Sequence, residues 1–494
     1  MSGTGTRAAT DRALPTPTTY WCETLLDDGV PVPGVRLTAG ADGHLTDRED
    51  NVSAAPGDIR LGTVLPGLAN AHSHAFHRAL RGRTHNQGGD FWRWRDTMYA
   101  VGHALDPELY RQLARAVFAE MLVSGYTAVG EFHYLHHRAD GTVYRPAHAM
   151  ELALAGAARE VGIRLVLLDT SYLAGGLDRP LQSDQLGFGD GNAAGWLSRW
   201  SALRDTLAAD AAARPAEPAL VTLGAALHSV RAVPLDAMRQ ILAELPADLP
   251  VHIHLSEQPQ ENTDCLAAYQ ATPTAVLHAL GALTPRLSVV HATHLEADDL
   301  ARLGAAGVTV VMCPTTEADL GDGIGPARAL AAAGARIALG SDQNAVIDPF
   351  LELRGLEMGE RLASRQRGRF TPADLLHAAS GNGYAALGLG GSLLVPGGPA
   401  DLVEVEAASI RTTGAHTEQL VLAATAADVR RVVVAGRIVA DAGRLVATAA
   451  AAAAPAGSPA ALLRHALAAL DSRAAQAAEA AAAEAATDNP AGLA

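Results

Sequence analysis

The chain has 494 residues, of which 49% are hydrophobic and 18% are charged, so it can bury a large core and is not a disordered protein. This length suggests a large barrel or two domains. The formal net charge of -15 argues against a nucleic-acid surface or an anionic-membrane surface. We therefore expect neither nucleic acid nor a membrane as a partner. Any anionic ligand must be held by local arginines.

Lysine is absent, so all 38 basic residues are arginine. This excludes a Schiff base, a pyridoxal-phosphate enzyme, a Walker lysine and a second metal bridged by a carboxylated lysine. The three cysteines are far apart, which predicts free thiols in a reducing compartment; they are Cys22, Cys265 and Cys313. The first 20 residues lack the apolar segment of a signal peptide, and no run of about 18 strongly apolar residues appears. We expect a cytoplasmic protein.

A β-rich opening, from Tyr20 to about Leu65, precedes an alternation of apolar runs and helical patterns. Eight apolar runs have strand character, at 64–71, 127–132, 163–168, 220–227, 251–255, 287–290, 308–312 and 337–339. Helix-period segments lie between most of them, at 108–123, 147–161, 235–245, 273–280 and 298–306. Eight strand-helix repeats predict an α/β fold, a (β/α)8 barrel of the TIM type with catalytic groups at the carboxyl ends of its strands.

The two ends of the chain are predicted to meet in a small β-sandwich domain. After about Pro396 the pattern changes to alternating strands with hairpin turns, which we expect to pair with the N-terminal strands. The predicted boundaries are 1–64 and 393–446 for the two parts of this domain, and 65–392 for a metal-dependent hydrolase barrel. Residues 447–494 form an Ala-rich tail that we expect to be helical or disordered, without an assigned function.

A His-x-His motif follows the first apolar run of the predicted barrel. His72 and His74 are two residues apart, so on a strand their side chains point to the same face. Such pairs are common by chance, but three later strands also end in possible metal ligands. Zinc in a catalytic site takes a few protein ligands and a water. We predict that one zinc ion per subunit is bound by His72, His74, His254 and Asp342.

Further residues at the strand ends have the chemistry to act on a substrate. Glu257 follows His254 by three residues, where a carboxylate could move a proton from the water to a leaving nitrogen. His291 ends the sixth predicted strand and could orient the water or polarise the substrate. His252 shares a strand face with His254, so spacing alone does not choose between them, although the deeper position of His252 favours a core role. Sites of this kind also accept iron or other divalent ions.

Six longer motifs carry a resemblance to a known family. They lie between about Pro66 and Arg361, at 70–76, 91–99, 125–137, 228–233, 252–258 and 313–324. They are similar to the N-formimino-L-glutamate deiminase family, in the mononuclear deaminase branch of the amidohydrolase superfamily. The resemblance implies that water activated by zinc adds to the formimino carbon, that ammonia leaves and that N-formyl-L-glutamate remains, a step of histidine degradation. It also implies a homodimer, and a catalytic role for Asp342 as proton acceptor beside His291 and Glu257.

The same resemblance implies the residues that bind the substrate. Arg95 and Arg231 match positions that hold its two carboxylates, and arginine binds a carboxylate through two parallel hydrogen bonds. Tyr134 and His228 match further substrate contacts. His77 stands where many relatives have a glutamine. A neutral histidine still donates one hydrogen bond there, but with a different geometry and with a charge that depends on pH.

Two other functions remain open from the sequence. The chain could be another amidohydrolase, such as a deaminase of aromatic bases or a ring hydrolase resembling imidazolonepropionase. The paired arginines argue against a base deaminase, because they suit a flexible dicarboxylate. It could also be a barrel without catalytic activity that serves as an interaction or assembly protein, which the intact set of metal ligands argues against.

Overall fold

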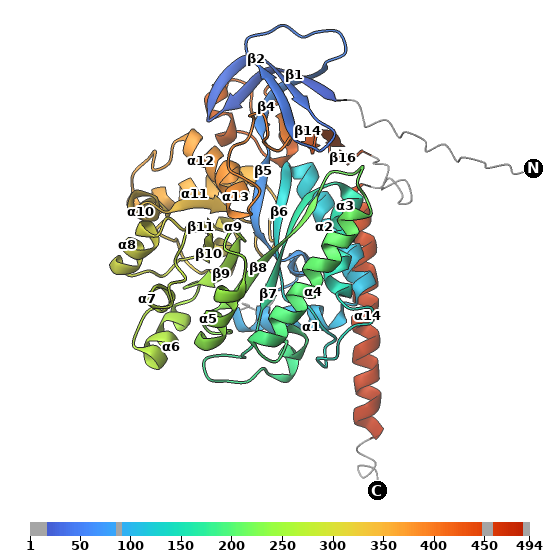
Figure 1. Ribbon diagram of the computed structural model, residues 1–494, viewed down its shortest axis with the longest axis vertical. Coiled ribbons are helices and arrows are strands. Elements are labelled where there is room, and N and C mark those ends of the chain that lie inside the picture. The colour runs from blue at the N-terminus through green and yellow to red at the C-terminus, as the bar shows by residue number, and fades with distance from the viewer. Residues whose placement is uncertain (1–16, 85–90, 447–457, 488–494) are drawn as a thin grey trace, which may run out of the picture.

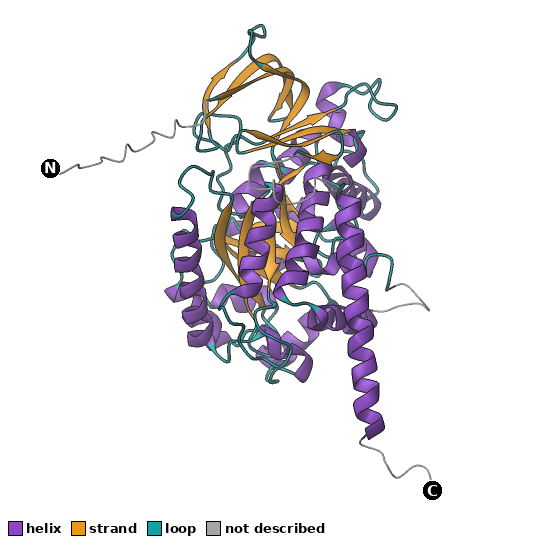
Figure 2. Cartoon of the chain, turned by 90° about the vertical axis from the view of Figure 1, so that its right-hand side faces the viewer, coloured by secondary structure: helices purple, strands orange, loops and turns teal. Residues whose placement is uncertain are grey.

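The computed structural model describes residues 17–84, 91–446 and 458–487. Its centre is a barrel of eight neighbouring parallel strands with helices on the outside (Figures 1 and 2). The barrel strands are β5 (Leu68–Ser73), β6 (Tyr126–His133), β7 (Arg164–Ser171), β8 (Val221–Ser229), β9 (Val251–Leu255), β10 (Leu287–His291), β11 (Thr309–Met312) and β12 (Arg336–Leu339). The predicted (β/α)8 barrel is confirmed.

The barrel strands read as almost continuous apolar runs because both of their faces are covered. Every residue of β6 and β7 is buried, since one face lies inside the barrel and the other packs against helices. This explains why short runs without alternation of polar and apolar residues were sufficient to locate the strands in the sequence.

The barrel closes between its first and last strands through a few contacts. A single parallel bridge joins Ser73 and Asp342, and the backbone N–H of Asp342 donates to the carbonyl of His72 at 2.9 Å. The side chain of Asn70 adds two hydrogen bonds to Ser341, at 2.6 Å to Oγ and 2.9 Å from the backbone N–H. The closure therefore fixes the end of β5 against the segment that follows β12.

Helices connect the strands and cover the barrel. They are α1 (Phe91–Ala104), α2 (Pro107–Ser124), α3 (Ala149–Val161), α4 (Ala193–Ala212), α5 (Leu235–Glu244), α6 (Pro259–Tyr269), α7 (Pro273–Ala279), α8 (Ala297–Ala305), α9 (Pro314–Leu320), α10 (Ala327–Ala333), α11 (Pro349–Ser364), α12 (Pro372–Ala379) and α13 (Gly381–Ala386), with short 3-10 turns η1 (Ala75–Leu80), η2 (Ser183–Phe188), η3 (Thr417–Leu422) and η4 (Ala426–Asp428). The helix α2 shows how the sequence sets the ends: Asp106 caps the N–H of Leu109, Pro107 opens the first turn, and Gly125 ends it with φ of 108°.

Strands from both ends of the chain form a second sheet, as predicted. Its order is β16-β15-β14-β13-β4-β1-β2-β3, so β13 pairs with β4 and joins the two ends (Figure 1). Its strands are β1 (Thr18–Asp27), β2 (Val30–Ala39), β3 (Leu45–Glu49), β4 (Ile59–Pro66), β13 (Leu402–Val405), β14 (Val429–Val434), β15 (Arg437–Asp441) and β16 (Arg444–Leu445).

One strand prediction is wrong in its bounds. The apolar run at 64–71 is two strands, because β4 ends at Pro66 in the small sheet and β5 begins at Leu68 in the barrel. Gly67 separates them at a crowded point, where a Cβ would lie 2.5 Å from the hydroxyl of Tyr384. The change of sheet occurs within one apolar run, so hydrophobicity alone does not reveal it.

A buried ion pair connects the barrel to the small sheet. Arg164 on β7 donates to both carboxylate oxygens of Asp401, at 2.6 and 3.1 Å. The same carboxylate accepts hydrogen bonds from the hydroxyl of Tyr384 at 2.6 Å and from the backbone N–H of Ala435 at 2.7 Å. Both charged side chains are buried, and a buried charge is tolerated only when it is paired and hydrogen-bonded in this way.

The Ala-rich tail is a long helix over its described part, α14 (Pro459–Thr487). It runs along the outside of the barrel and past its lower end in the view of Figure 1. Ala466 and Leu470 are buried in the main hydrophobic core, and Asp471 pairs with Arg83 at 2.6 Å. Residues 447–457 and 488–494 of the predicted tail lie outside the described residues. Among the residues described, no helix is both long and apolar enough to cross a membrane.

Candidate active site

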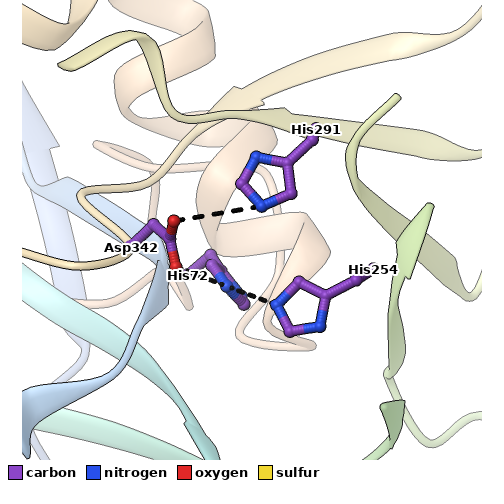
Figure 3. Close-up of side chains that lie close together, drawn as sticks. All are labelled: His72, His254, His291 and Asp342. Carbon is purple, nitrogen blue, oxygen red and sulfur yellow. Dashed lines mark hydrogen bonds and ion pairs between the residues drawn. The ribbon is translucent and has the colours of Figure 1, made fainter. Parts of the chain in front are cut away.

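Four buried side chains from different strands converge inside one end of the barrel (Figure 3). His72 comes from β5, His254 from β9 and His291 from β10, while Asp342 follows β12. Nε2 of His254 lies 3.1 Å from Nε2 of His72, which in turn lies 3.3 Å from Oδ1 of Asp342. One ligand atom of each side chain lies within 4.8 Å of the others, so the group has the size and composition of a metal site.

His74 joins this group from the side of Asp342. Its Nε2 lies 3.4 Å from Oδ1 of Asp342, the same oxygen that faces His72. The structure thus brings together the four predicted ligands, His72, His74, His254 and Asp342. It also places Nε2 of His291 at 3.9 Å from the other carboxylate oxygen of Asp342.

Hydrogen bonds set two of these imidazoles in the form that binds a metal. Nδ1 of His74 donates to the carbonyl of Phe132 at 2.8 Å, and Nδ1 of His254 donates to the carbonyl of His228 at 2.9 Å. Burial lowers the pKa of His74 and of His254 well below the usual value, so both rings are neutral. Each Nε2 then presents a lone pair to the cluster, as a bound divalent ion requires. The donor set therefore fits a metal ion.

The neighbouring His252 has a different environment. Its Nε2 donates to the carbonyl of Ala386 at 2.9 Å, and burial lowers its pKa to about 4. The side chain is fully buried against α13. Of the two histidines that spacing could not distinguish, it is His254 that faces the cluster, while His252 is a core residue.

His291 is held between two carboxylates. Its Nε2 lies 3.7 Å from Glu257, and its Nδ1 lies 3.4 Å from Glu317, which also accepts a hydrogen bond from the backbone N–H of Cys313 at 2.9 Å. Burial opposes the charge of His291, but Glu257, Glu317 and Asp342 raise its pKa to about 10. Burial also raises the pKa of Glu257. Glu317 belongs to one of the sequence motifs, yet nothing in the sequence indicated that it would support His291.

The backbone at these strand ends adopts rare conformations. His291, Asp342 and Ser256 have φ of 69°, 42° and 50°, in the left-handed region that side chains with a Cβ seldom occupy. Gly340 allows its own backbone to lie close to His72, since a Cβ at position 340 would lie 2.8 Å from Cβ of His72. Such concentrated strain is a feature of functional sites.

A cavity of about 80 Å³ adjoins the cluster, and all five predicted substrate-binding residues line it. It is lined mainly by aromatic and cationic side chains, with carboxylates at the cluster end: His74, His77, Trp94, Arg95, Met98, Tyr99, Tyr134, Tyr172, Gly175, Gln185, Phe188, His228, Arg231, His254, Glu257, His291, Leu320 and Asp342. The predicted catalytic residues therefore lie beside the predicted substrate-binding residues in one site.

Polar contacts fix the wall of this cavity. His77 is 3.1 Å from the hydroxyl of Tyr134, and burial lowers its pKa to about 3, so it is neutral. Gln185 donates to the hydroxyls of Tyr99 and Tyr172, each at 3.1 Å. Sequence reasoning missed Tyr172 and Gln185, because both lie at or after the end of β7, in a segment without a motif.

The two arginines at the cavity have different surroundings. The guanidinium of Arg95 lies over the ring of Tyr99, 5.6 Å from its centroid. Arg231 makes no ion pair within 4 Å with any carboxylate of the described residues. Burial opposes its charge, whereas Tyr172, Glu261 and Glu257 raise its pKa. Arg231 is therefore a retained cation that is available to an anionic ligand.

Comparison with known proteins now identifies the family. The sequence profile of the amidohydrolase family matches residues 63–439. The chain belongs to the amidohydrolase family. This amidohydrolase is 37% identical over 420 residues to the formimidoylglutamate deiminase of Pseudomonas aeruginosa. The matched region covers 82% of this chain and 90% of that protein. The predicted family relationship is confirmed.

Two further comparisons show the range of proteins similar to this amidohydrolase. The 8-oxoguanine deaminase of Pseudomonas aeruginosa is 29% identical over 395 residues, which cover 77% of this chain and 82% of that protein. The crystal structure of an amidohydrolase from Brucella melitensis matches with a TM-score of 0.83 and 30% identity, over 92% of this chain and 99% of that chain. The likeness thus includes the small sheet as well as the barrel.

Proposed function

We propose that this protein is a zinc-dependent N-formimino-L-glutamate deiminase, which forms N-formyl-L-glutamate and ammonia in histidine degradation. The observation that carries the proposal is one cavity with a metal-type His/Asp cluster at one end and the cations Arg95 and Arg231 in its wall. A substrate with one C=N group and two carboxylates matches this arrangement. The 37% identity to a formimidoylglutamate deiminase supports it. The proposal includes a homodimer, which rests on the family resemblance, and a cytoplasmic location, which rests on the three free cysteines.

In the proposed site, His72, His74, His254 and Asp342 hold one zinc ion per subunit. The two neutral histidines with oriented Nε2 atoms support this assignment. A divalent ion bound there supplies one function, which is to lower the pKa of a water toward neutrality.

The protein side chains then move the protons. Asp342 accepts a proton from the attacking water, and His291, held by Glu317 on its far side, orients that water. Glu257 delivers a proton to the imino nitrogen, and the upward shift of its pKa by burial supports this role. As water adds to the formimino carbon, the π bond of the C=N group breaks and the carbon carries a hydroxyl group and an amino group. Asp342 then passes the proton that it took from the water to the amino group, and the hydroxyl group returns a proton to Glu257 as the carbonyl forms. The C–N bond to that nitrogen breaks, and its electron pair leaves with ammonia. The carbonyl of N-formyl-L-glutamate remains.

The other end of the cavity positions the substrate. Arg95 and Arg231 bind the two carboxylates, and each guanidinium can make two parallel hydrogen bonds. Tyr134 and His228 contribute further contacts. His77 replaces the glutamine of many relatives, and its hydrogen bond to Tyr134 keeps it at the wall of the cavity.

The experiment that tests the proposal is the release of ammonia from N-formimino-L-glutamate, with and without a chelator. We expect release that stops when the metal is removed and returns when zinc is added. Guanine, cytosine and 8-oxoguanine are measured in parallel, because a relative with 29% identity is an 8-oxoguanine deaminase. Release from one of these bases, with none from N-formimino-L-glutamate, would contradict the proposal.

A further inference from the structure

A buried carboxyl group that has no role so far lies next to the proposed site. Glu261 is in the first turn of α6 and lines a vestibule of about 1040 Å³. Arg231 and Glu257 line both this vestibule and the inner cavity, so the two spaces are adjacent. Only 8% of Glu261 is exposed. A ligand that reaches Arg231 from the vestibule therefore passes close to this carboxyl group.

One oxygen of Glu261 has no hydrogen-bond partner among the described residues. The backbone N–H of Ser256 lies close enough to the carboxyl group to affect its charge, and Oε1 is buried and unpaired. A buried polar atom without a partner is costly, and native proteins contain few of them. Since Glu261 lines the vestibule that adjoins the site, a ligand is a natural partner for its carboxyl group.

The charges around Glu261 come from several elements. Arg231 follows β8, Glu257 is in the loop after β9, and His291 ends β10. On α6 itself, the nearest titratable neighbours are Asp264 and Cys265, and Arg95 of α1 lines the same vestibule. Burial and Glu257 raise the pKa of Glu261 to about 7, against the opposing effects of Arg231, the Ser256 N–H and His291. Near neutral pH the group thus exists in both the acid and the ionised form.

We propose that Glu261 is a specificity-determining residue whose carboxyl group, in its acid form, donates a hydrogen bond across the vestibule to the substrate carboxylate held by Arg231. This inference rests on the proposed function, because it requires a substrate that carries a carboxylate at that end. The ionised form has no proton to donate and places a second negative charge beside the same guanidinium. The ionised Glu261 would compete with the substrate carboxylate for Arg231. An uncharged amide group of a substrate analogue in the same place could still donate a hydrogen bond to the ionised Glu261. Glu261 would therefore make recognition of an anionic end depend on pH.

A purely structural role for Glu261 predicts something different. Its carboxyl group also lies beside Ser256, in the loop that carries Glu257. If support of this loop were its whole role, Glu261→Gln would lower kcat or stability and leave the pH dependence of KM unchanged. Glutamine keeps an oxygen that can accept from the Ser256 N–H, and its amide group can donate a hydrogen bond at every pH.

The test measures kcat and KM between pH 6 and pH 8.5 with the zinc-loaded native enzyme. The substrates are N-formimino-L-glutamate and its diamide, in which both carboxylates are amidated. Both carboxylates of the first remain ionised in this range. We expect KM for the dicarboxylate to rise by about tenfold, the effect of one hydrogen bond to a charged group, and KM for the amide not to rise. In Glu261→Gln, KM for the dicarboxylate should stay low at all pH values, and in Glu261→Ala it should be high and constant.

Asp264→Asn is the matched control. Asp264 lies one turn further along α6, at the same vestibule, and is exposed. This variant should keep the native rise in KM. A native KM that is constant with pH, or an equal rise in Glu261→Gln, would overturn the inference and leave the proposed function intact. A native enzyme that releases no ammonia from N-formimino-L-glutamate would overturn both.

Discussion

The substitution Arg231→Met tests whether the cavity is built for a dicarboxylate. Methionine keeps most of the apolar part of the side chain and removes the guanidinium. Because Arg231 pairs with no carboxylate of the described residues, a substrate carboxylate would be its direct ionic partner. Hydrogen bonds to a charged group contribute about 1.5–3 kcal/mol. The variant should therefore lose a factor of about 10–150 in kcat/KM, with most of the loss in binding of the anionic end.

The assay compares two substrates in two proteins. The values of kcat/KM are measured for N-formimino-L-glutamate and for its diamide, in which both carboxylates are amidated, with the native enzyme and with Arg231→Met. The amide should be a poor substrate of the native enzyme and should lose little more in the variant. Arg239→Met is a suitable control, since Arg239 is on α5 with its side chain 62% exposed and pairs with Asp236 at the surface. Equal proportional losses for both substrates would show that Arg231 supports the fold or a loop, and would refute the dicarboxylate assignment.

Three further outcomes follow from the geometry. His254→Ala should lose most of the bound metal, whereas His252→Gln should retain its metal. Metal analysis of the purified variants checks this, and full metal content in His254→Ala would exclude His254 as a ligand. Glu257→Gln should keep its metal while kcat falls by about 10²-fold or more, and near-normal kcat across pH would disprove its role. Asp401→Asn should lower the free energy of unfolding in urea by about 3–5 kcal/mol because Arg164 is left buried without its partner, and a change below about 1 kcal/mol would contradict this.

The barrel could be predicted because its strands are buried on both faces and each is followed by a helical pattern. The point where the chain passes from one sheet to the other could not be predicted. The apolar run at 64–71 continues through Pro66 and Gly67, and only the packing of Tyr384 and Asp401 against Gly67 shows that the chain changes sheets there. Hydrophobicity reports burial, but it does not report which of two cores buries a residue.

The candidate site shows the same limit at the level of single residues. His72 and His74 could be paired from their spacing, since alternate residues of a strand share a face. The role of His252 as a core residue, by contrast, is settled by its hydrogen bond to the carbonyl of Ala386, far away in the chain. Glu261 carried no signal in the sequence, because its significance depends on the cavity beside it.

The pairing of β4 with β13 has a consequence for the order of synthesis. The strands β1 to β4 leave the ribosome first, yet the neighbour that covers the outer edge of β4 is made only after the last barrel strand. Until then β4 presents unpaired N–H and C=O groups, the type of edge that pairs readily with another chain. The N-terminal sheet therefore stays incomplete while the barrel is translated, and the arrival of β13 determines whether that edge pairs within the chain or with another chain.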